Sequence, residues 1–219
     1  DALRVAEKIV VVTVSKPLSG TYANAEAAAK EVASDRISLV DSRSASLGEG
    51  MLVLRGLELA AQGVPPGEIA TELARVRTQS SGFFVVDKLD RLIRSGRVSR
   101  LAGWLGTRLN LKPILTLTPE GEVDSAGRAR GREAAKTKVL ALLDRALAAR
   151  PQSLRLGVVH AGIHQFAETL RQELVRRYAP KEALISPITP VLAAHTGIGT
   201  WGVFYQVEDG TNDGGRRYE

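Results

Sequence analysis

The stretch Ile9–Val32, IVVVTVSKPLSGTYANAEAAAKEV, contains the three signals that predict the start of an α/β fold. Ile9–Val14 is an almost unbroken β-branched run, as in a strand that is buried on both faces of a parallel sheet. Ala23–Val32 is rich in alanine, which predicts a helix whose small side chains permit close packing on that sheet. Leu18–Tyr22 joins the strand to the helix. In α/β proteins such a junction binds anionic groups, because the free N–H groups of the helix N-terminus carry partial positive charge.

The residues of this junction suit an anion site. Gly20 lets the backbone approach a ligand closely, and Ser19 and Thr21 add hydroxyl groups. The alternative is an ordinary N-cap, in which a Ser or Thr side chain satisfies only its own helix. The junction alone leaves both interpretations open.

The remaining elements predict two layers. Strand Ile37–Val40 and helices Glu49–Gln62 and Pro66–Arg77 continue a βαβα pattern, which implies a parallel sheet with right-handed crossovers. The second half favours an α+β layer with a mostly antiparallel sheet. We predict an α/β domain over 1–80, an α+β domain over 81–208 and a disordered polar tail over 209–219. The elements predicted in the second half are strands at Phe83–Val86, Arg155–His160, Ala183–Thr189 and Thr200–Val207, short helices at Leu89–Arg94 and Ser99–Leu109, a hairpin arm at Lys112–Thr118 with its turn at Pro119–Glu122, and helices at Arg132–Ala149 and Gln165–Tyr178.

The composition argues against several classes of protein. No apolar run is long enough to cross a bilayer, no secretory leader pattern is present, and the absence of cysteine excludes disulfides and thiolate metal sites. We therefore expect a soluble, cytoplasmic protein without integral membrane association. The net charge of +6 is spread along the chain and aromatic residues make up only 5% of it, so we expect no nucleic-acid partner. Because the sequence begins with Asp1, we expect a processed chain or a fragment.

Three other sequence patterns are candidates for a functional site. Gly197–Gly202 matches G-x-G-x-x-G, but a strand is predicted after it where a dinucleotide site needs a helix. His160 and His164 are four residues apart, but one closes a strand and the other opens a helix, so they need not face each other, and we predict no metal site. Ser42 and Ser46 follow the second strand, where carboxyl-end loops line the ligand crevice of a parallel sheet. We expect both to line a pocket, with capping of the next turn by Asp41 as the alternative role of this loop.

Taken in order, the motifs of the chain resemble those of the DegV family. They cover almost the whole sequence, and their ordered co-occurrence is more specific than any one of them. The matching words are Ser15–Tyr22 (SKPLSGTY), Val40–Ser42 (VDS) with Ser46, Gly48 and Gly50, Leu92–Ser99 (LIRSGRVS), Leu111–Leu115 (LKPIL), Arg130 with Ala134, and His195–Gly197 (HTG) with Gly199, Gly202 and Tyr205.

The resemblance implies a DegV-like two-domain fold that holds one long-chain fatty acid of about fourteen to eighteen carbons, with no other cofactor. It also implies the lipid-carrying subunit of a bacterial two-part fatty acid kinase, without activity of its own. In such a pair an ATP-binding kinase subunit phosphorylates the bound carboxylate to an acyl-phosphate, so the role belongs to phospholipid metabolism.

The site residues come from the same resemblance. Ser19 would hydrogen-bond the carboxylate with support from Gly20 and Thr21. The resemblance also brings in four residues that follow the first domain in the sequence. His195 and Thr196 would approach the carboxylate, and Arg97 and Arg130 would lie at the mouth, facing the carboxylate or the incoming phosphoryl group.

The sequence departs from the family pattern at two places, and two other functions remain as alternatives to lipid binding. Family members normally carry an earlier strand and a Thr-Ser-Gln-Pro-Ser word whose Thr contacts the head group, so the chain is either truncated or lacks part of that site. Ser95 stands where Gly is usual. The first alternative is a stand-alone hydrolase or transferase with Ser19 as nucleophile and His195 as base. The second is a basic DNA-binding regulator.

Overall fold

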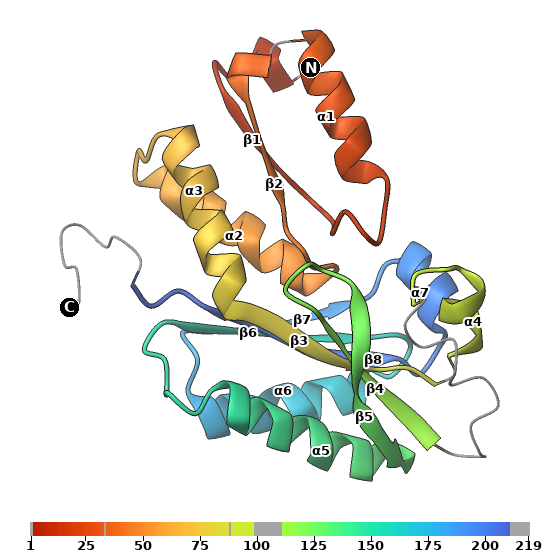
Figure 1. Ribbon diagram of the computed structural model, residues 1–219. Coiled ribbons are helices and arrows are strands. Elements are labelled where there is room, and N and C mark those ends of the chain that lie inside the picture. Colours follow the sequence, from red (N-terminus) through yellow and green to blue (C-terminus); the bar gives the residue numbers. More distant parts are fainter. Residues whose placement is uncertain (1, 33, 88, 99–110, 211–219) are drawn as a thin grey trace.

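The structure is a computed structural model that describes residues 2–32, 34–87, 89–98 and 111–210. The described chain forms two units, each built on its own sheet (Figure 1). In chain order the elements are η1 (Ala2–Arg4), β1 (Ile9–Thr13), α1 (Thr21–Val32), η2 (Ser34–Arg36), β2 (Ile37–Asp41), α2 (Leu47–Ala61), α3 (Pro66–Val76), η3 (Arg77–Gln79), β3 (Ser80–Val85), α4 (Asp90–Arg94), β4 (Leu111–Leu117), β5 (Val123–Arg130), α5 (Gly131–Ala146), β6 (Leu154–His160), α6 (His164–Tyr178), β7 (Glu182–Pro187), α7 (Pro190–Thr196) and β8 (Trp201–Val207), where η marks a 3-10 helix.

The first unit is a parallel pair of strands between helices. β1 and β2 pair in parallel, from Ile9 opposite Ile37 to Thr13 opposite Asp41. Helices α2 and α3 cover one side of the pair and α1 lies on the other (Figure 1). The apolar core lies on the α2–α3 side, where Leu52, Leu59, Ile69, Leu73 and Val76 pack with Val40.

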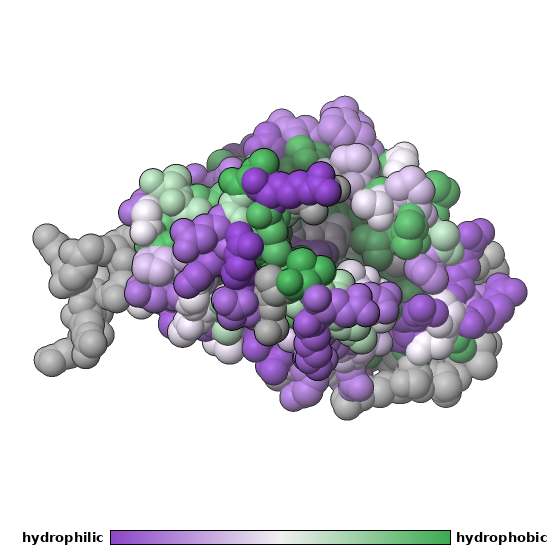
Figure 2. Space-filling view, turned by 90° about the horizontal axis from the view of Figure 1, so that it is seen from above, coloured by the Kyte–Doolittle hydropathy of each residue, from purple (hydrophilic) through white to green (hydrophobic). Residues whose placement is uncertain are grey.

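One expectation for this unit was wrong. The strand residues Ile9–Val12 are half-buried rather than buried on both faces, because the described sheet has only two strands here. Ala29 is the one buried alanine of α1. Figure 2 looks down on this unit and shows hydrophobic residues near the middle of the face, with hydrophilic residues around most of its edge.

The second unit is a six-stranded sheet of order β5-β4-β3-β8-β6-β7. Every neighbouring pair is antiparallel except β6 with β7. Helices α5 and α6 cover one face (Figure 1), and the core between them and the sheet includes Trp201, Val203, Leu143 and Leu170. The fold class is therefore confirmed: a parallel α/β unit is joined to an α+β unit with a mostly antiparallel sheet.

Most of the predicted elements are present with boundaries shifted by a few residues. The β4–β5 hairpin forms as expected, and Pro187 ends β7, which is an edge strand. The seven-residue helix α7 was not predicted. The helix predicted at Ser99–Leu109 and the tail residues 211–219 lie outside the described residues. Asp209 was assigned to the tail, but its carboxylate accepts the backbone N–H groups of Gln152 and Ser153 at 3.0 and 2.6 Å.

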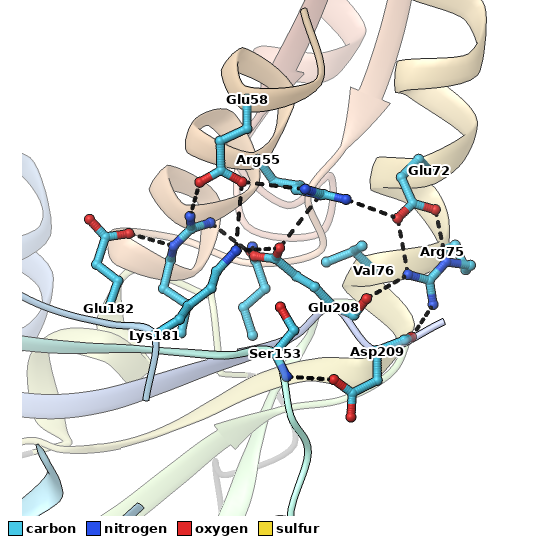
Figure 3. A network of polar contacts seen from close by, with 12 residues as sticks. Arg55, Glu58, Glu72, Arg75, Val76, Ser153, Lys181, Glu182, Glu208 and Asp209 are labelled. Atoms are coloured by element: carbon cyan, nitrogen blue, oxygen red, sulfur yellow. Dashed lines mark hydrogen bonds and ion pairs between the residues drawn. The ribbon is translucent and has the colours of Figure 1, made fainter. Parts of the chain in front are cut away.

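Helix α2 joins the two units. Its first turns pack Met51 and Leu47 against Val159 and Phe204 of the large sheet. Its last turns carry Arg55 and Glu58 into a network of ion pairs with residues of the second unit (Figure 3). The other members of this network are Glu72, Arg75, Arg155, Lys181, Glu182, Glu208 and Asp209.

Candidate functional site

The loops that leave the two parallel strands lie against each other. Ser15 N–H donates to the carbonyl of Ser44 at 2.8 Å, and Ser42 N–H donates to the carbonyl of Thr13 at 3.0 Å. The Asp41 carboxylate accepts the N–H groups of Lys16 and Arg43 at 3.2 and 3.0 Å. Asp41 thus holds the two loops together, which extends the turn-capping role that the sequence suggested.

The turn of the β4–β5 hairpin closes these loops from the second unit. The buried hydroxyl of Ser15 donates to the carbonyl of Gly121 at 2.8 Å. Gly121 has φ +88°, and a Cβ atom there would collide with Ser15 Oγ and with the backbone of Arg43. Only glycine fits this close approach without strain. The candidate site therefore lies at the junction of the two units.

Half-buried Ser19 and exposed Gly20 lead into α1, which begins at the exposed Thr21. Ser19 Oγ accepts the N–H of Thr21 at 3.3 Å and lies 2.7 Å from Thr21 Oγ1. This geometry fits the ordinary N-cap. It also places two hydroxyls beside open space, because no atom beyond the neighbouring residues lies within 4 Å of a Cβ built on Gly20. Leu18 anchors the loop against an apolar cluster that contains Leu115 and other residues of the second unit.

The second unit reaches this loop through α4 and α7. Arg97, just after α4, donates from Nε to the Leu18 carbonyl at 3.4 Å, and α4 contacts α7, which carries His195 and Thr196. His195 is half-buried. Thr196 is buried, and its hydroxyl donates to the Leu192 carbonyl at 2.9 Å. The structure thus links the two distant motifs through α4.

The geometry lacks the pairing that the hydrolase alternative needs. Among the hydrogen bonds of the described residues, none joins Ser19 to His195, and Ser19 Oγ is paired with Thr21 instead. A serine nucleophile is activated by a base within hydrogen-bond reach. The contacts of Ser19 do not favour that chemistry.

Arg130 lies apart from the other predicted site residues. It ends β5 and pairs with Leu111, at the opposite end of the hairpin from the turn that meets Ser15. Seven residue steps separate Arg130 from Val123 at the start of β5, and at 3.3 Å per residue this is about 23 Å. The structure therefore connects Arg97 to the Ser19 loop by a hydrogen bond, whereas Arg130 lies at the end of β5 that is remote from the turn meeting Ser15.

A cavity of about 540 Å³ lies between the two units beside the strand-end loops. Ser42 lines it, as expected, whereas Ser46 is not among its lining residues; Ser46 is the N-cap of α2, with φ 55°. The cavity is lined by Ser42, Arg43, Ser44, Gly48, Leu52, Arg77, Thr78, Gln79, Ser80, Ser81, Leu117, Thr118, Pro119, Ala146, Ala149, Pro151, Tyr205, Val207 and Asp209.

A smaller cavity of about 240 Å³ shares Arg43 and Arg77 with the larger one. Its other lining residues include Lys16, Tyr22 and Asp41. Arg43 and Arg77 could not be recognised as site residues from the sequence, because neither falls in a recognisable motif. The available signal was weak: Arg43 follows a strand end, and Arg77 follows a helix that returns to the same edge.

His160 and His164 do meet, which the sequence left open. His164 Nδ1 lies 3.3 Å from His160 Nε2, and the two rings are in edge contact. Burial, and then the neighbouring His164, lower the pKa of His160. Over the described part of the chain, no group of three or more His, Cys, Asp or Glu is arranged to hold a metal ion.

Comparison with known proteins assigns the family. Residues 2–208 match the family model described as "Uncharacterised protein, DegV family". The chain belongs to the DegV family. A curated relative, a DegV domain-containing protein of Clostridium perfringens, is 32% identical over 202 residues, which are 90% of this chain and 69% of that protein.

Solved structures of DegV proteins share the fold. A DegV family protein from Thermus thermophilus, described by its fatty acid binding, is 40% identical and superimposes with a TM-score of 0.87 over 94% of this chain and 73% of that one. A DegV protein from Ruminococcus gnavus, refined with vaccenic acid, is 27% identical, with a TM-score of 0.80 over 91% of this chain and 72% of that one. Among the described residues, no helix of this DegV protein is both long and apolar enough to cross a membrane.

Proposed function

We propose that this DegV protein binds one long-chain fatty acid at the junction of its two units. The similarity to the Thermus protein carries the proposal, because that protein binds fatty acid and matches 94% of this chain at 40% identity. In this proposal the carboxylate lies at Ser19, Gly20 and Thr21, close to the positively polarised start of α1.

The apolar packing beside this loop supplies a route for the acyl chain. Leu117 lines the large cavity and also packs on the apolar cluster that Leu18 joins, so the cavity and the Ser19 loop share one apolar border. A volume of about 540 Å³ lies within the range of small-molecule pockets. Burial of a sixteen-carbon chain contributes roughly 11 kcal/mol before the cost of association, which is sufficient for tight binding.

The proposal extends to a partner kinase that phosphorylates the bound carboxylate. Val191 and Ile198, which flank His195, are 69% and 73% exposed, although they are apolar. Exposed apolar residues beside a polar site are typical of a protein-binding surface. Arg97 is exposed at the same edge and would neutralise charge on the transferred phosphoryl group. Arg130, at the far end of the hairpin, would contact the partner instead.

Lipid binding is tested first. Native mass spectrometry of protein from a bacterial host should show one bound acid of fourteen to eighteen carbons. After delipidation, Ser19→Ala should weaken fatty-acid binding by about 1–3 kcal/mol, the usual effect of depriving a charged group of one hydrogen bond. Ser186→Ala, which removes a hydroxyl from the edge strand β7, is the matched control. Protein that carries no acid and takes up none after delipidation would contradict the proposal.

Phosphotransfer is tested with the kinase subunit from the same source. Arg97→Ala should keep its fatty acid but lower the rate of acyl-phosphate formation. Arg94→Ala removes an exposed arginine of α4 three residues away and should leave that rate unchanged. Loss of lipid uptake in Arg97→Ala would instead place Arg97 in the lipid pocket.

A further inference from the structure

Three cations converge at the junction of the two units. Lys16, Arg43 and Arg77 line the smaller cavity, and none of them takes part in an ion pair among the described residues. By contrast, the buried Arg55 and Arg155 each contact carboxylates. Asp41 is the one acidic residue that lines the smaller cavity, so its lining carries an excess of two positive charges.

The existing contacts of these cations leave donors unused. Arg77 Nη1 donates to the backbone carbonyl of Asp41, while its buried Nε has no hydrogen-bond partner. Arg43 Nη1 donates to the Pro119 carbonyl at 3.0 Å. Lys16 Nζ lies 3.5 Å from the centre of the Tyr22 ring. A buried donor without a partner is costly in a folded protein, and a bound anion would satisfy it.

The backbone conformation of Arg43 and the charges around Arg77 also favour a bound anion. Arg43 has φ 50°, in the left-handed region, where a residue with a Cβ is strained. Such strain persists where the surrounding structure fixes it, and it clusters at ligand sites. Burial, and then the Arg43 guanidinium that shares the cavity lining, lower the pKa of Arg77 more than the Asp41 carboxylate and Tyr22 raise it. An anion between them would relieve this repulsion.

We propose that Arg43 and Arg77, with Lys16, form a binding site for a phosphate-type anion. Guanidinium groups present paired N–H donors that match phosphate oxygens, and the excess of two positive charges suits a dianion. The site faces both cavities and lies beside the Ser19 loop, because Lys16 and Tyr22 flank that loop. The phosphate comes either from solution or from an ester carried by a longer ligand. Binding of inorganic phosphate here does not depend on fatty-acid binding.

The test is a phosphorus-31 NMR titration of the full chain with inorganic phosphate and, separately, with a short alkyl phosphate, at constant ionic strength. Saturable binding that is weakened about tenfold or more by Arg77→Gln, the loss expected for one charge-assisted hydrogen bond, supports the site. Arg43→Gln provides a second test, because its exposed side chain is easier to replace without unfolding. Binding of inorganic phosphate identifies the free ion as sufficient, and binding of the alkyl phosphate alone identifies an ester.

The control is Arg145→Gln, which removes one exposed charge from α5. It should bind phosphate as the unaltered chain does, and circular dichroism should show that all variants are folded. The proposal is overturned if neither compound binds saturably at millimolar concentration, if Arg43→Gln and Arg77→Gln bind as well as the unaltered chain, or if Arg145→Gln weakens binding equally.

Discussion

Arg155→Met tests whether the ion network holds the two units together. The Arg155 side chain is 2% exposed and contacts the carboxylates of Glu58, Glu182 and Glu208 (Figure 3). Glu58 and Glu182 are 37% and 42% exposed, so water replaces much of what they lose. Glu208 is 1% exposed and cannot be rehydrated in place, so the effect of the substitution depends mainly on this residue.

The remaining partners of Glu208 determine how much stability Arg155→Met loses. Without Arg155 it still accepts from Lys181 Nζ at 2.7 Å and Gln206 Nε2 at 2.8 Å, and Arg55 Nε remains 3.5 Å away. The loss is therefore smaller than the 3–5 kcal/mol that follows when a buried charge is left alone. One charge-assisted hydrogen bond is worth about 1.5–3 kcal/mol, and the two exposed pairs add less than about 1 kcal/mol each. We expect the free energy of unfolding to fall by about 2–4 kcal/mol.

Urea unfolding followed by circular dichroism and by tryptophan fluorescence measures this loss. Arg177→Met is the matched control, because Arg177 pairs with Asp144 and both side chains are more than 40% exposed. It should cost less than about 1 kcal/mol. If Arg155→Met costs no more than Arg177→Met, the network does not stabilise the junction and the reasoning fails.

Three further changes probe the junction and the second unit. Gly121→Ala should lower the free energy of unfolding by about 2 kcal/mol or more, because the new methyl group meets Ser15 and a positive φ; a thermal midpoint equal to that of the unaltered chain would refute this. Burial raises the pKa of Glu58, but the cations Arg155, Lys181 and Arg55 together outweigh it, and the net pKa lies below 4.5. The stability it contributes is therefore complete above pH 4.5 and lost as pH falls through the lowered pKa, so unfolding of Glu58→Gln should depend less steeply on pH in that range. The lowered pKa of His160 means that the unfolded chain binds more protons, so stability should fall as pH drops below about 6.5, and His160→Asn should reduce that fall in urea titrations.

The local elements of this fold could be read from the sequence, because they depend on short-range patterns. The βαβ start, the hairpin at Pro119–Glu122 and the edge position of Pro187 each have a local cause. Helix α7 was missed, although Thr189 and Pro190 give the signal: the Thr189 hydroxyl accepts the N–H of Leu192 at 3.4 Å and Pro190 occupies the first helical position.

Contacts between segments far apart in the sequence could not be predicted in the same way. The last strand, β8, enters the middle of the large sheet between β3 and β6, and no local pattern specifies that position. The sequence did not indicate that Arg55 and Arg155 are buried, because arginine is rarely buried without a partner and the Glu208 carboxylate that both contact comes from a distant segment. The shared cavity of Arg43 and Arg77 could not be predicted either, because the two residues meet only where β2 and α3 end at the same edge.

Helix α2 gives the candidate sites and the ion network a common support. Its start lines the large cavity at Gly48 and Leu52, and its last turns hold Arg55 and Glu58 in the network. Its Met51 packs on the second unit between these two regions. A shift of α2 relative to the large sheet would therefore change the cavity and the ion pairs together. Since ligand affinity depends on a preformed pocket, we expect the buried charges of the network to affect binding through this helix.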